Sequence, residues 1–444
     1  MTSATTADLA SLHQRPVELL QRLLRFDTTN PPGNETACIH FVRDILEAVG
    51  CETTLYERMP GRPNLVSRLP GEGSSAPLLL QGHVDVVTTQ DQAWTHPPFE
   101  GRLVDGVVWG RGALDMKGGV AMLVAAFARA RAEGIRLPGD VILAVLADEE
   151  AGGDMGARFL AEEHPELFAG VRYALGEFGG FAMTVGGRRF YPIQVAEKQI
   201  CWLKATVRGP GGHGALINRG GTMARLARFL RDLDRKRLPL HVTPVVRQMV
   251  ETMADALPRA QGIVLRSLLN PRLADGALRL LGAQGAVFEP MLRNTVNATM
   301  LRGGEKINVV PSRIELELDA RALPGFGPAD LMAELHDAVG RDIELELVRH
   351  DAGPPAPNLG LFETLARVIR ELDADGIPVP LLQVGVTDAR FFAGLGIQTY
   401  GFLPMNLPPD FAFTKLIHAA DERIPASAVE FGTDAVYRAL QRFG

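Results

Sequence analysis

Residues 77–85 read Pro-Leu-Leu-Leu-Gln-Gly-His-Val-Asp, an apolar run that passes directly into polar residues. A continuous apolar run is typical of a strand that is buried on both faces of a sheet. Residues 141–146, Val-Ile-Leu-Ala-Val-Leu, repeat this pattern, and the segment from Val120 to Arg131 between the two runs has helical character. Strands that alternate with helices predict an α/β layer architecture.

The predicted order of strands and helices changes near Glu197. We expect strands at 200–208, 295–301, 313–323 and 343–348, and helices at 222–233 and 329–339. The order β-α-β-β-α-β predicts a ferredoxin-like domain inserted into the larger one. Residues 241–285 form an additional helical excursion whose role the sequence does not indicate, and residues 352–357 are expected to link back. The predicted division is 1–196 and 353–444 for the first domain and 197–352 for the inserted domain.

Composition narrows the class of protein. The chain has 444 residues, of which 46% are hydrophobic and 22% charged, a balance typical of a soluble protein with two or three domains. A net charge of -6 gives no broad basic field, so nucleic acid is not an expected partner. The three cysteines form no CxxC pair, and the sequence has neither a signal-like start nor an apolar run of about 18 residues. These features predict a cytoplasmic protein without a membrane segment.

His83 and Asp85 follow the first buried strand, at the end where open α/β sheets hold their ligands. In an extended chain, residues two apart project to the same side, so Asp85 can accept a hydrogen bond from one ring nitrogen of His83. The other nitrogen would then be free to bind a metal. The alternative is that His83 is a structural histidine with satisfied hydrogen bonds.

Three further segments carry acidic side chains. Asp115 lies in a glycine-dense loop ahead of a helix, where the alternative role is a helix cap. Glu149 and Glu150 follow the second buried strand, and if strand geometry continues they point to opposite sides. One could then hold a metal while the other faces a bound water, although an acidic surface loop is the alternative. Glu177 follows another short apolar run.

His418 lies far along the chain in an acidic setting. Two histidines and three carboxylates are sufficient for two zinc ions that share one bridging carboxylate and leave a position open for water. The set therefore predicts a two-metal site more strongly than any of its members.

In order and nearly in spacing, these segments resemble the motifs of the dinuclear-zinc metallopeptidase family that includes aminoacylase, glutamate carboxypeptidase, acetylornithine deacetylase and succinyl-diaminopimelate desuccinylase. The resemblance extends to residues 28–33, Thr-Thr-Asn-Pro-Pro-Gly, and to the inserted domain, so it covers almost the whole chain. It implies a zinc-peptidase-like α/β/α catalytic domain with an inserted ferredoxin-like lid and dimerisation domain. The excursion at 241–285 makes this lid longer than the family's usual one.

The resemblance also implies roles for single residues. Asp115 would bridge the metals, with a cis peptide bond after it, and Glu149 would be the general base. The implied metal ligands are His83, Asp115, Glu150, Glu177 and His418. Asp85 would be a further catalytic residue. The protein would form a homodimer through the lid, and each subunit would bind two zinc ions, which Co²⁺ or Mn²⁺ can replace.

The implied substrate contacts lie mostly in the lid. His213, in the glycine-rich loop 209–214, would reach a neighbouring subunit's active site and stabilise the oxyanion. Asn308 and Arg321 resemble substrate-binding residues, as do Thr387 and Arg390 in a later loop. A solvated His213 in a plain turn and an exposed Arg321 on a strand are the alternatives.

Together these features predict a two-zinc hydrolase of amide bonds in small substrates that bear a free carboxylate. Metal-activated water would attack the amide carbonyl, and Glu149 would accept its proton. The sequence does not separate a carboxypeptidase or dipeptidase from an N-acyl-amino-acid deacylase. A protein of the same fold that binds metal and regulates without turnover is an alternative of another class.

Overall fold

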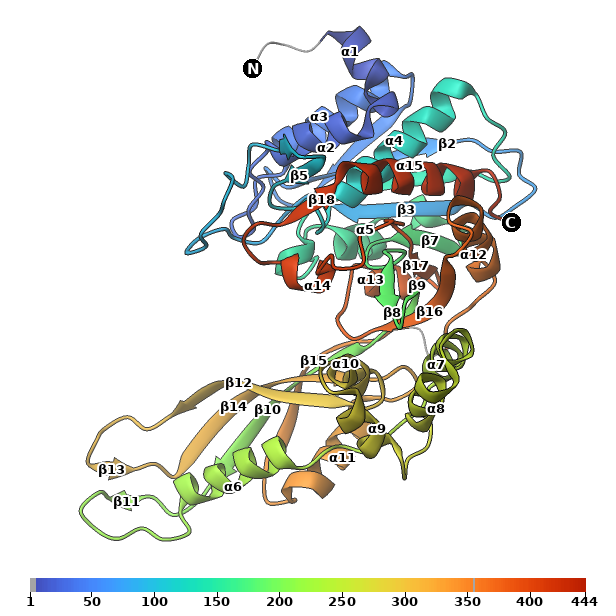
Figure 1. The fold of residues 1–444 in the computed structure, drawn as a ribbon. Helices are drawn as coiled ribbons and strands as arrows, with labels where there is room; N and C mark the ends of the chain where they lie inside the picture. The colour runs from blue at the N-terminus through green and yellow to red at the C-terminus, as the bar shows by residue number, and fades with distance from the viewer. Residues whose placement is uncertain (1–4, 354–355) are drawn as a thin grey trace. The chain divides into compact units, whose positions relative to one another are not determined.

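The computed structural model describes residues 5–353 and 356–444. These residues form two compact units (Figure 1). The larger unit comprises the described residues of 1–195, 357–381 and 387–444, and the smaller unit those of 196–356 and 382–386. The predicted linker at 352–357 includes Pro354 and Pro355, which lie outside the described residues.

A mixed nine-stranded sheet forms the centre of the larger unit, with the order β1-β2-β6-β3-β7-β17-β9-β16 and β8 paired to β9. The neighbours β6, β3, β7 and β17 are parallel, whereas β1, β2 and β8 pair antiparallel. The strands are β1 (Thr53–Glu57), β2 (Pro63–Leu69), β3 (Leu78–His83), β6 (Val141–Leu146), β7 (Tyr173–Gly176), β8 (Met183–Val185), β9 (Arg188–Glu197), β16 (Ile377–Gln383) and β17 (Gln398–Gly401). A separate three-stranded sheet contains β4 (Arg102–Val104), β5 (Val107–Trp109) and β18 (Arg423–Pro425).

Helices cover both faces of the large sheet. As their apolar runs predicted, β3 and β6 are therefore buried on both sides. On one face, Gly82 of β3 lies against Met116 and Val120, and α4 packs with α2 and α15 (Figure 1). On the other face, Leu79 shares an apolar cluster with Phe159 of α5. The helices of this unit are α1 (Thr6–Ser11), α2 (Pro16–Leu24), α3 (Thr36–Ala48), α4 (Lys117–Glu133), α5 (Ala157–Glu163), α12 (Phe362–Leu372), α13 (Ala389–Ala393), α14 (Phe413–Leu416) and α15 (Ala426–Leu440).

The smaller unit contains a four-stranded antiparallel sheet of order β12-β14-β10-β15. Its strands are β10 (Gln199–Arg208), β12 (Thr295–Gly303), β14 (Arg313–Ala322) and β15 (Glu344–Asp351). Helices α6 (Thr222–Arg235) and α11 (Pro328–Val339) pack on one apolar core with this sheet. Each of these strands and helices was predicted within a few residues of its observed position.

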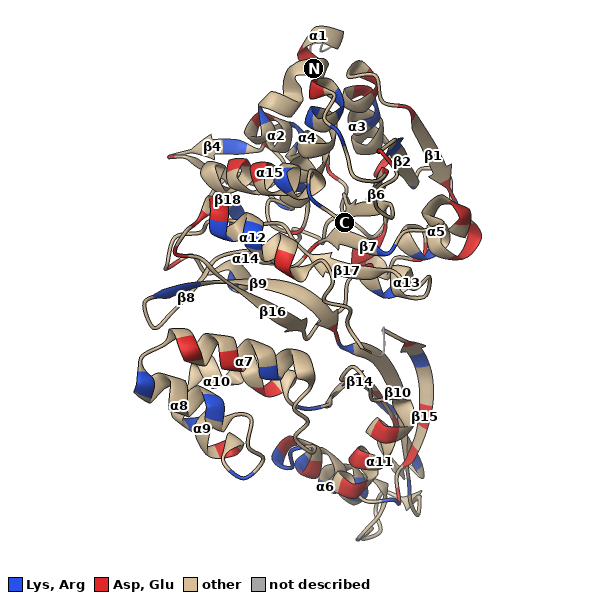
Figure 2. Ribbon diagram, turned by 90° about the vertical axis from the view of Figure 1, so that its right-hand side faces the viewer, with Lys and Arg blue, Asp and Glu red and all other residues tan. Residues whose placement is uncertain are grey.

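The excursion is helical, as predicted. It contains α7 (Pro244–Ala256), α8 (Arg259–Ser267), α9 (Ala274–Leu281) and α10 (Ala283–Phe288). A separate two-stranded antiparallel sheet of β11 (Gly212–His213) and β13 (Val309–Val310) completes the smaller unit. Figure 2 shows acidic and basic residues interspersed along helices such as α6. Among the described helices, none is both long and apolar enough to cross a membrane.

Candidate metal centre

The five predicted metal ligands all belong to the larger unit and meet at one edge of its sheet. His83 is the last residue of β3, and Glu177 directly follows β7. Glu150 lies in a short 3-10 turn, Glu149–Ala151, after β6. Because these three strands are adjacent and parallel, their carboxyl ends lie side by side. Asp115 precedes α4, and its peptide bond to Met116 is cis, as the resemblance implied.

Asp115 lies between two histidines, and each of its carboxylate oxygens faces a different one. Oδ1 lies 3.3 Å from Nε2 of His83, and Oδ2 lies 3.1 Å from Nε2 of His418. Glu177 Oε2 lies 3.5 Å from the His83 nitrogen, and Glu150 Oε2 lies 3.2 Å from the His418 nitrogen. This is the arrangement that one carboxylate needs in order to bridge two cations.

The donor atoms fit divalent metal ions. Among the described residues, the buried Nε2 of His83 and Oε1 of Glu150 have no hydrogen-bond partner. Nδ1 of His83 lies 3.0 Å from the backbone carbonyl oxygen of Asp85, which can only accept, so Nδ1 carries a hydrogen and the neutral ring offers the lone pair of Nε2 to a metal. Two groups of donors each lie within 4.8 Å: His83, Glu149 and Glu177; and Asp115, Glu150 and His418.

Crowding of buried carboxylates shifts the proton equilibria in this cluster. Burial, followed by the charge of Glu177, raises the pKa of Glu149 well above its usual range. Burial likewise raises the pKa of Glu150 to about 7, although the hydrogen bond with His418 opposes it. Hydrogen bonds with Asp115 and Glu150 raise the pKa of His418 to about 10. Divalent cations are suited to neutralise such a cluster.

Strand geometry, the condition under which Glu149 and Glu150 would point to opposite sides, does not continue through these residues. The left-handed conformation of Asp148, with φ of 72°, ends the strand direction, and the 3-10 turn begins at the next residue. The two side chains nevertheless reach different donor groups. The turn, rather than the pleat of a strand, separates them.

Asp85 holds this turn. Its Oδ1 accepts the N–H of Glu149 and its Oδ2 the N–H of Glu150, each at 3.1 Å. Oδ1 lies 3.4 Å from Nδ1 of His83, beyond the 3.0 Å contact of that nitrogen with the Asp85 carbonyl. Asp85 therefore contacts the His83 ring mainly through its backbone, and its carboxylate positions the Glu149–Glu150 turn.

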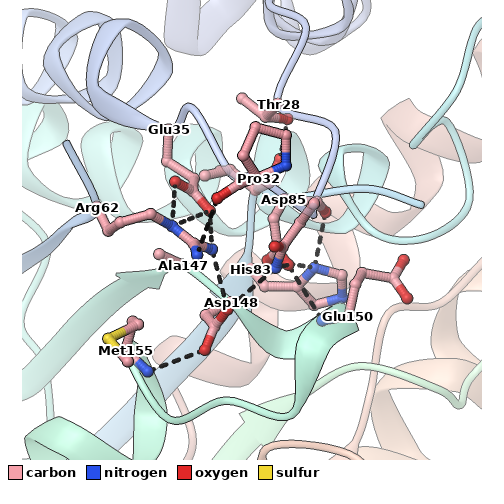
Figure 3. A network of polar contacts seen from close by, with 12 residues as sticks. Thr28, Pro32, Glu35, Arg62, His83, Asp85, Ala147, Asp148, Glu150 and Met155 are labelled. Carbon is pink, nitrogen blue, oxygen red and sulfur yellow. Dashed lines mark hydrogen bonds and ion pairs between the residues drawn. The ribbon is translucent and has the colours of Figure 1, made fainter. Parts of the chain in front are cut away.

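A network that the sequence interpretation missed supports Asp85 and Asp148 (Figure 3). Asn30 donates to Oδ2 of Asp85 at 2.8 Å and to Oδ1 of Asp148 at 3.1 Å. The buried Arg62 binds both oxygens of Glu35 and also donates to Asp148 at 3.0 Å. The quoted segment 28–33 contains Asn30, but nothing in it identified the partners of its side chain.

Glu422 is another residue at the metal centre for which the sequence predicted no role. It is fully buried, and its Oε1 accepts the N–H groups of Leu114 at 2.7 Å and Asp115 at 3.0 Å. Its Oε2 accepts from Nη1 of Arg111 at 2.6 Å, and Nη2 of Arg111 donates to Gln92 at 2.8 Å. The Gln92 amide also donates to the backbone carbonyl of His418 at 2.9 Å. This chain of contacts, buried at Glu422 and exposed where Gln92 meets His418, joins the loop of Asp115 to the segment of His418.

Thr387 and Arg390 also lie in the larger unit. Oγ1 of the buried Thr387 accepts the N–H of Ala389. Arg390 donates to the carbonyl of Gly152 at 3.0 Å, and its Nη1 lies 3.8 Å from Oε1 of Glu149. Arg390 therefore contacts the turn that carries Glu149.

His213, Asn308 and Arg321 belong to the smaller unit. His213 is exposed on β11, and its Nδ1 accepts the N–H of Ala215, so the hydrogen is on Nε2. Asn308 directly precedes β13, the partner strand of β11, and its carbonyl accepts the N–H of Gly214. Arg321 binds Asp319 through two nitrogens, and among the described residues its buried Nη1 has no hydrogen-bond partner.

The chain is similar to known proteins over most of its length. Residues 79–442 match the profile described as Peptidase family M20/M25/M40. Pig (Sus scrofa) aminoacylase-1 is 27% identical over 437 residues, which cover 94% of this chain and 92% of that protein.

Two solved structures have the same fold. The M20 family metallo-carboxypeptidase Sso-CP2 from Sulfolobus solfataricus has a TM-score of 0.66 at 16% identity and covers 96% of this chain and 98% of its own. The Bacillus subtilis YXEP protein, described as a dinuclear metal binding peptidase from the M20 family, has a TM-score of 0.59 at 12% identity, with 97% and 98% covered.

Proposed function

Because this chain belongs to peptidase family M20/M25/M40 and is a hydrolase of peptide or other amide bonds, we propose that it uses two metal ions to cleave small substrates with a free carboxylate. The observation that carries this proposal is the position of Asp115, with one oxygen toward His83 and the other toward His418. A protein that only binds metal is not favoured, since Glu149 and every ligand are present.

We propose zinc as the metal, held by His83, Asp115 and Glu177 at one position and by Asp115, Glu150 and His418 at the other. Imidazole and carboxylate are ordinary zinc ligands. When bound, the ions would polarise the amide carbonyl and lower the pKa of a bound water. The description of the Bacillus subtilis relative as a dinuclear metal binding peptidase supports the metal count.

Glu149 is the proposed general base. Its buried carboxylate has a raised pKa and lies in the group formed with His83 and Glu177. A carboxylate with these properties can accept a proton from the attacking water and return it to the leaving nitrogen. Arg390, 3.8 Å from Glu149, would keep that side chain in place.

The smaller unit would supply the substrate contacts and act as a ferredoxin-like lid through which two subunits associate. Arg321 suits a substrate carboxylate because its buried Nη1 has no partner among the described residues. His213 and Asn308 lie at the two-stranded sheet of β11 and β13, near Arg313, the first residue of β14, whereas Arg321 lies near the other end of β14. Eight residues of strand span roughly 26 Å, so His213 and Arg321 of one chain are too far apart to bind one small substrate.

This separation supports an active site built from two chains. Arg321 of one subunit and His213 of its partner would then contact the same substrate, with Nε2 of His213 donating to the oxyanion. Oligomeric state measured by light scattering tests the first requirement of this arrangement.

Metal removal tests the proposed function. Protein treated with a chelator, and verified by elemental analysis, is incubated with dipeptides and N-acyl amino acids, and products are identified by mass spectrometry. We expect no hydrolysis until zinc, cobalt or manganese is returned. Full hydrolysis by the metal-free protein would overturn the proposal, and the identity of the products would separate a peptidase from a deacylase.

A further inference from the structure

The helical excursion of the smaller unit exposes large apolar side chains. Four aliphatic residues on or beside α8, α9 and α10 are mostly exposed: Ile263 (66%), Leu273 (53%), Leu280 (74%) and Val287 (53%). A single exposed aliphatic residue is ordinary in a folded protein, but a group of them on neighbouring helices marks an interaction surface. The excursion, whose role the sequence did not indicate, therefore has a candidate role on its outer face.

In α8 the exposed residues form one stripe. Arg259, Ile263 and Arg266 are spaced by four and three residues and are all exposed, whereas Gly262 and Leu265 are buried. Residues spaced in this way lie on one face of a helix. Helix α8 therefore presents an isoleucine between two arginines to solvent.

Helix α9 and the turn before it repeat this composition. Arg272 and Leu273 are followed seven residues later by Arg279 and Leu280, so the two pairs project from the same side. All four side chains are exposed, whereas Leu278 is buried. Because α9 contacts both α8 and α10, the exposed stripes of the three helices adjoin (Figure 1). The exposed side chains of residues 257–288 together form the α8–α10 surface.

The exposed charges of the α8–α10 surface are all basic, and they belong to Arg259, Arg266, Arg272 and Arg279. The one acidic residue between 257 and 288 is Asp275, which is half-buried and pairs with Arg237 and Arg293. Arg266 pairs with Asp255 of α7. Within the described chain, no ion pair is formed by the remaining three, Arg259, Arg272 and Arg279. The whole chain has a net charge of -6, so this basic surface is a local feature (Figure 2).

The composition of the α8–α10 surface favours an anionic lipid partner. An arginine guanidinium can bind two phosphate oxygens at once, and its apolar stem can lie along a hydrocarbon surface. Leucine and isoleucine beside arginine are typical of helices that lie in the interface of an anionic bilayer. Protein interfaces depend instead on aromatic anchors. Residues 257–288 contain a single aromatic residue, the half-buried Phe288.

We propose that the α8–α10 surface binds bilayers that contain anionic phospholipids. The boundary between headgroups and acyl chains receives the exposed aliphatic side chains of Ile263, Leu273, Leu280 and Val287. The lipid phosphates are bound by the unpaired arginines Arg259, Arg272 and Arg279. The contact is peripheral, since none of the described helices is long and apolar enough to cross a membrane. It determines where the enzyme works and does not depend on the chemistry of the metal centre.

Vesicle flotation of the full-length, metal-loaded protein tests this proposal. Vesicles of phosphatidylcholine alone are compared with vesicles that contain equal parts of phosphatidylcholine and phosphatidylglycerol. We expect binding to the mixed vesicles at low ionic strength and little binding to the neutral ones. Binding to the mixed vesicles should decrease as sodium chloride is added, because salt screens the charges of the exposed arginines.

Replacement of the three unpaired arginines by glutamine tests the charge requirement. Each arginine near an anionic surface raises the binding constant roughly 5-fold, so the triple variant should bind roughly 100-fold more weakly. The matched control removes three exposed arginines of the larger unit that also form no ion pair within the described chain, Arg172, Arg188 and Arg367. This control has the same net charge as the first variant and should retain wild-type binding.

A second pair of variants tests the apolar requirement. Ile263→Ser combined with Leu280→Ser should weaken binding to the mixed vesicles by at least about 10-fold, because two aliphatic side chains no longer leave water. The control combines Met59→Ser with Leu103→Ser, which are exposed residues of the larger unit. Circular dichroism and unchanged hydrolysis of a soluble substrate would show that the variants are folded, and Leu280→Ser alone replaces the double variant if that protein is unfolded.

Three results would overturn the proposal: no binding to the mixed vesicles at low ionic strength, equal binding to neutral vesicles, or equal loss of binding in the α8–α10 variants and their controls. Retention on immobilised polyglutamate, together with normal vesicle binding by the serine variants, would assign the surface to an acidic protein and would also overturn it. None of these results bears on the proposed hydrolysis, which the metal-removal experiment tests separately.

Discussion

Glu422 offers a direct test of how the metal-binding loops are held. Glu422→Gln replaces one carboxylate oxygen by an NH2 group, which cannot accept a hydrogen bond. Whichever way the amide turns, two of the four donors that now bind the carboxylate lose their acceptor. The guanidinium of Arg111, only 1% exposed, also loses its anionic partner.

The size of the effect follows from this burial. Removing one partner of a buried ion pair costs about 3–5 kcal/mol, because the remaining charge stays out of water. Arg111 keeps its hydrogen bond to Gln92 and its position over the Trp94 ring, at 5.2 Å from the ring centroid, so we expect the lower half of this range. Total stabilities of about 5–15 kcal/mol leave the variant folded, which permits measurement of its metal affinity.

Two measurements check this prediction: the free energy of unfolding in urea and competition for zinc with a chelating dye. The free energy of unfolding and the affinity for zinc should both decrease, because the loop of Asp115 loosens when either the N–H groups of Leu114 and Asp115 or the donors of Gly112 and Arg111 lose their acceptor. Glu371→Gln is the control, because Glu371 pairs with Arg442 at the surface, where ion pairs contribute little. Wild-type unfolding and wild-type zinc affinity in Glu422→Gln would refute the reasoning.

The other predictions concern the metal centre and the subunit arrangement. Glu149→Gln should retain both metals by elemental analysis while kcat falls by roughly 10²–10⁴; Glu150→Gln should instead lose metal, and equal metal content with full activity in both would contradict these roles. Metal binding must displace protons from Glu150 and His418, whose pKa values are about 7 and about 10. The apparent affinity for zinc should therefore rise with pH across neutrality, and binding should release protons. Calorimetry in buffers of different ionisation enthalpy measures this proton release. His213→Ala and Glu149→Ala subunits, each nearly inactive alone, should recover roughly one quarter of wild-type activity after refolding together, because half of the dimers are mixed and each has one intact site; no recovery in proven heterodimers would exclude action across the interface.

The sequence was sufficient where the signal was local. The apolar runs that became β3 and β6 reveal strands buried on both faces, since burial constrains every residue of the run. His83 could be assigned to one edge of the sheet because it follows such a run directly. The strands and helices of the smaller unit were likewise predictable from periodicity alone.

The sequence was insufficient where distant partners decide the local conformation. Asp148 adopts a left-handed conformation and binds Asn30 and Arg62, which precede it by 118 and 86 residues. That conformation ends the strand direction and starts a turn. Glu422 lies 307 residues after Asp115, and no pattern in either segment indicates that the two are in contact.

Two buried carboxylates explain how the cluster of ligands is held without using up the ligands themselves. Asp85 accepts the backbone N–H groups of Glu149 and Glu150, and Glu422 accepts those of Leu114 and Asp115. Hydrogen bonds from backbone N–H groups to an ionised carboxylate are stronger than those between neutral groups. Asp85 and Glu422 can therefore each fix one loop without the other. The side-chain oxygens of the ligand loops are thereby left facing the histidines. Asp85→Asn should therefore disturb mainly the loop of Glu149 and Glu150, and Glu422→Gln mainly the loop of Asp115. Metal affinities measured for the two variants can resolve this difference.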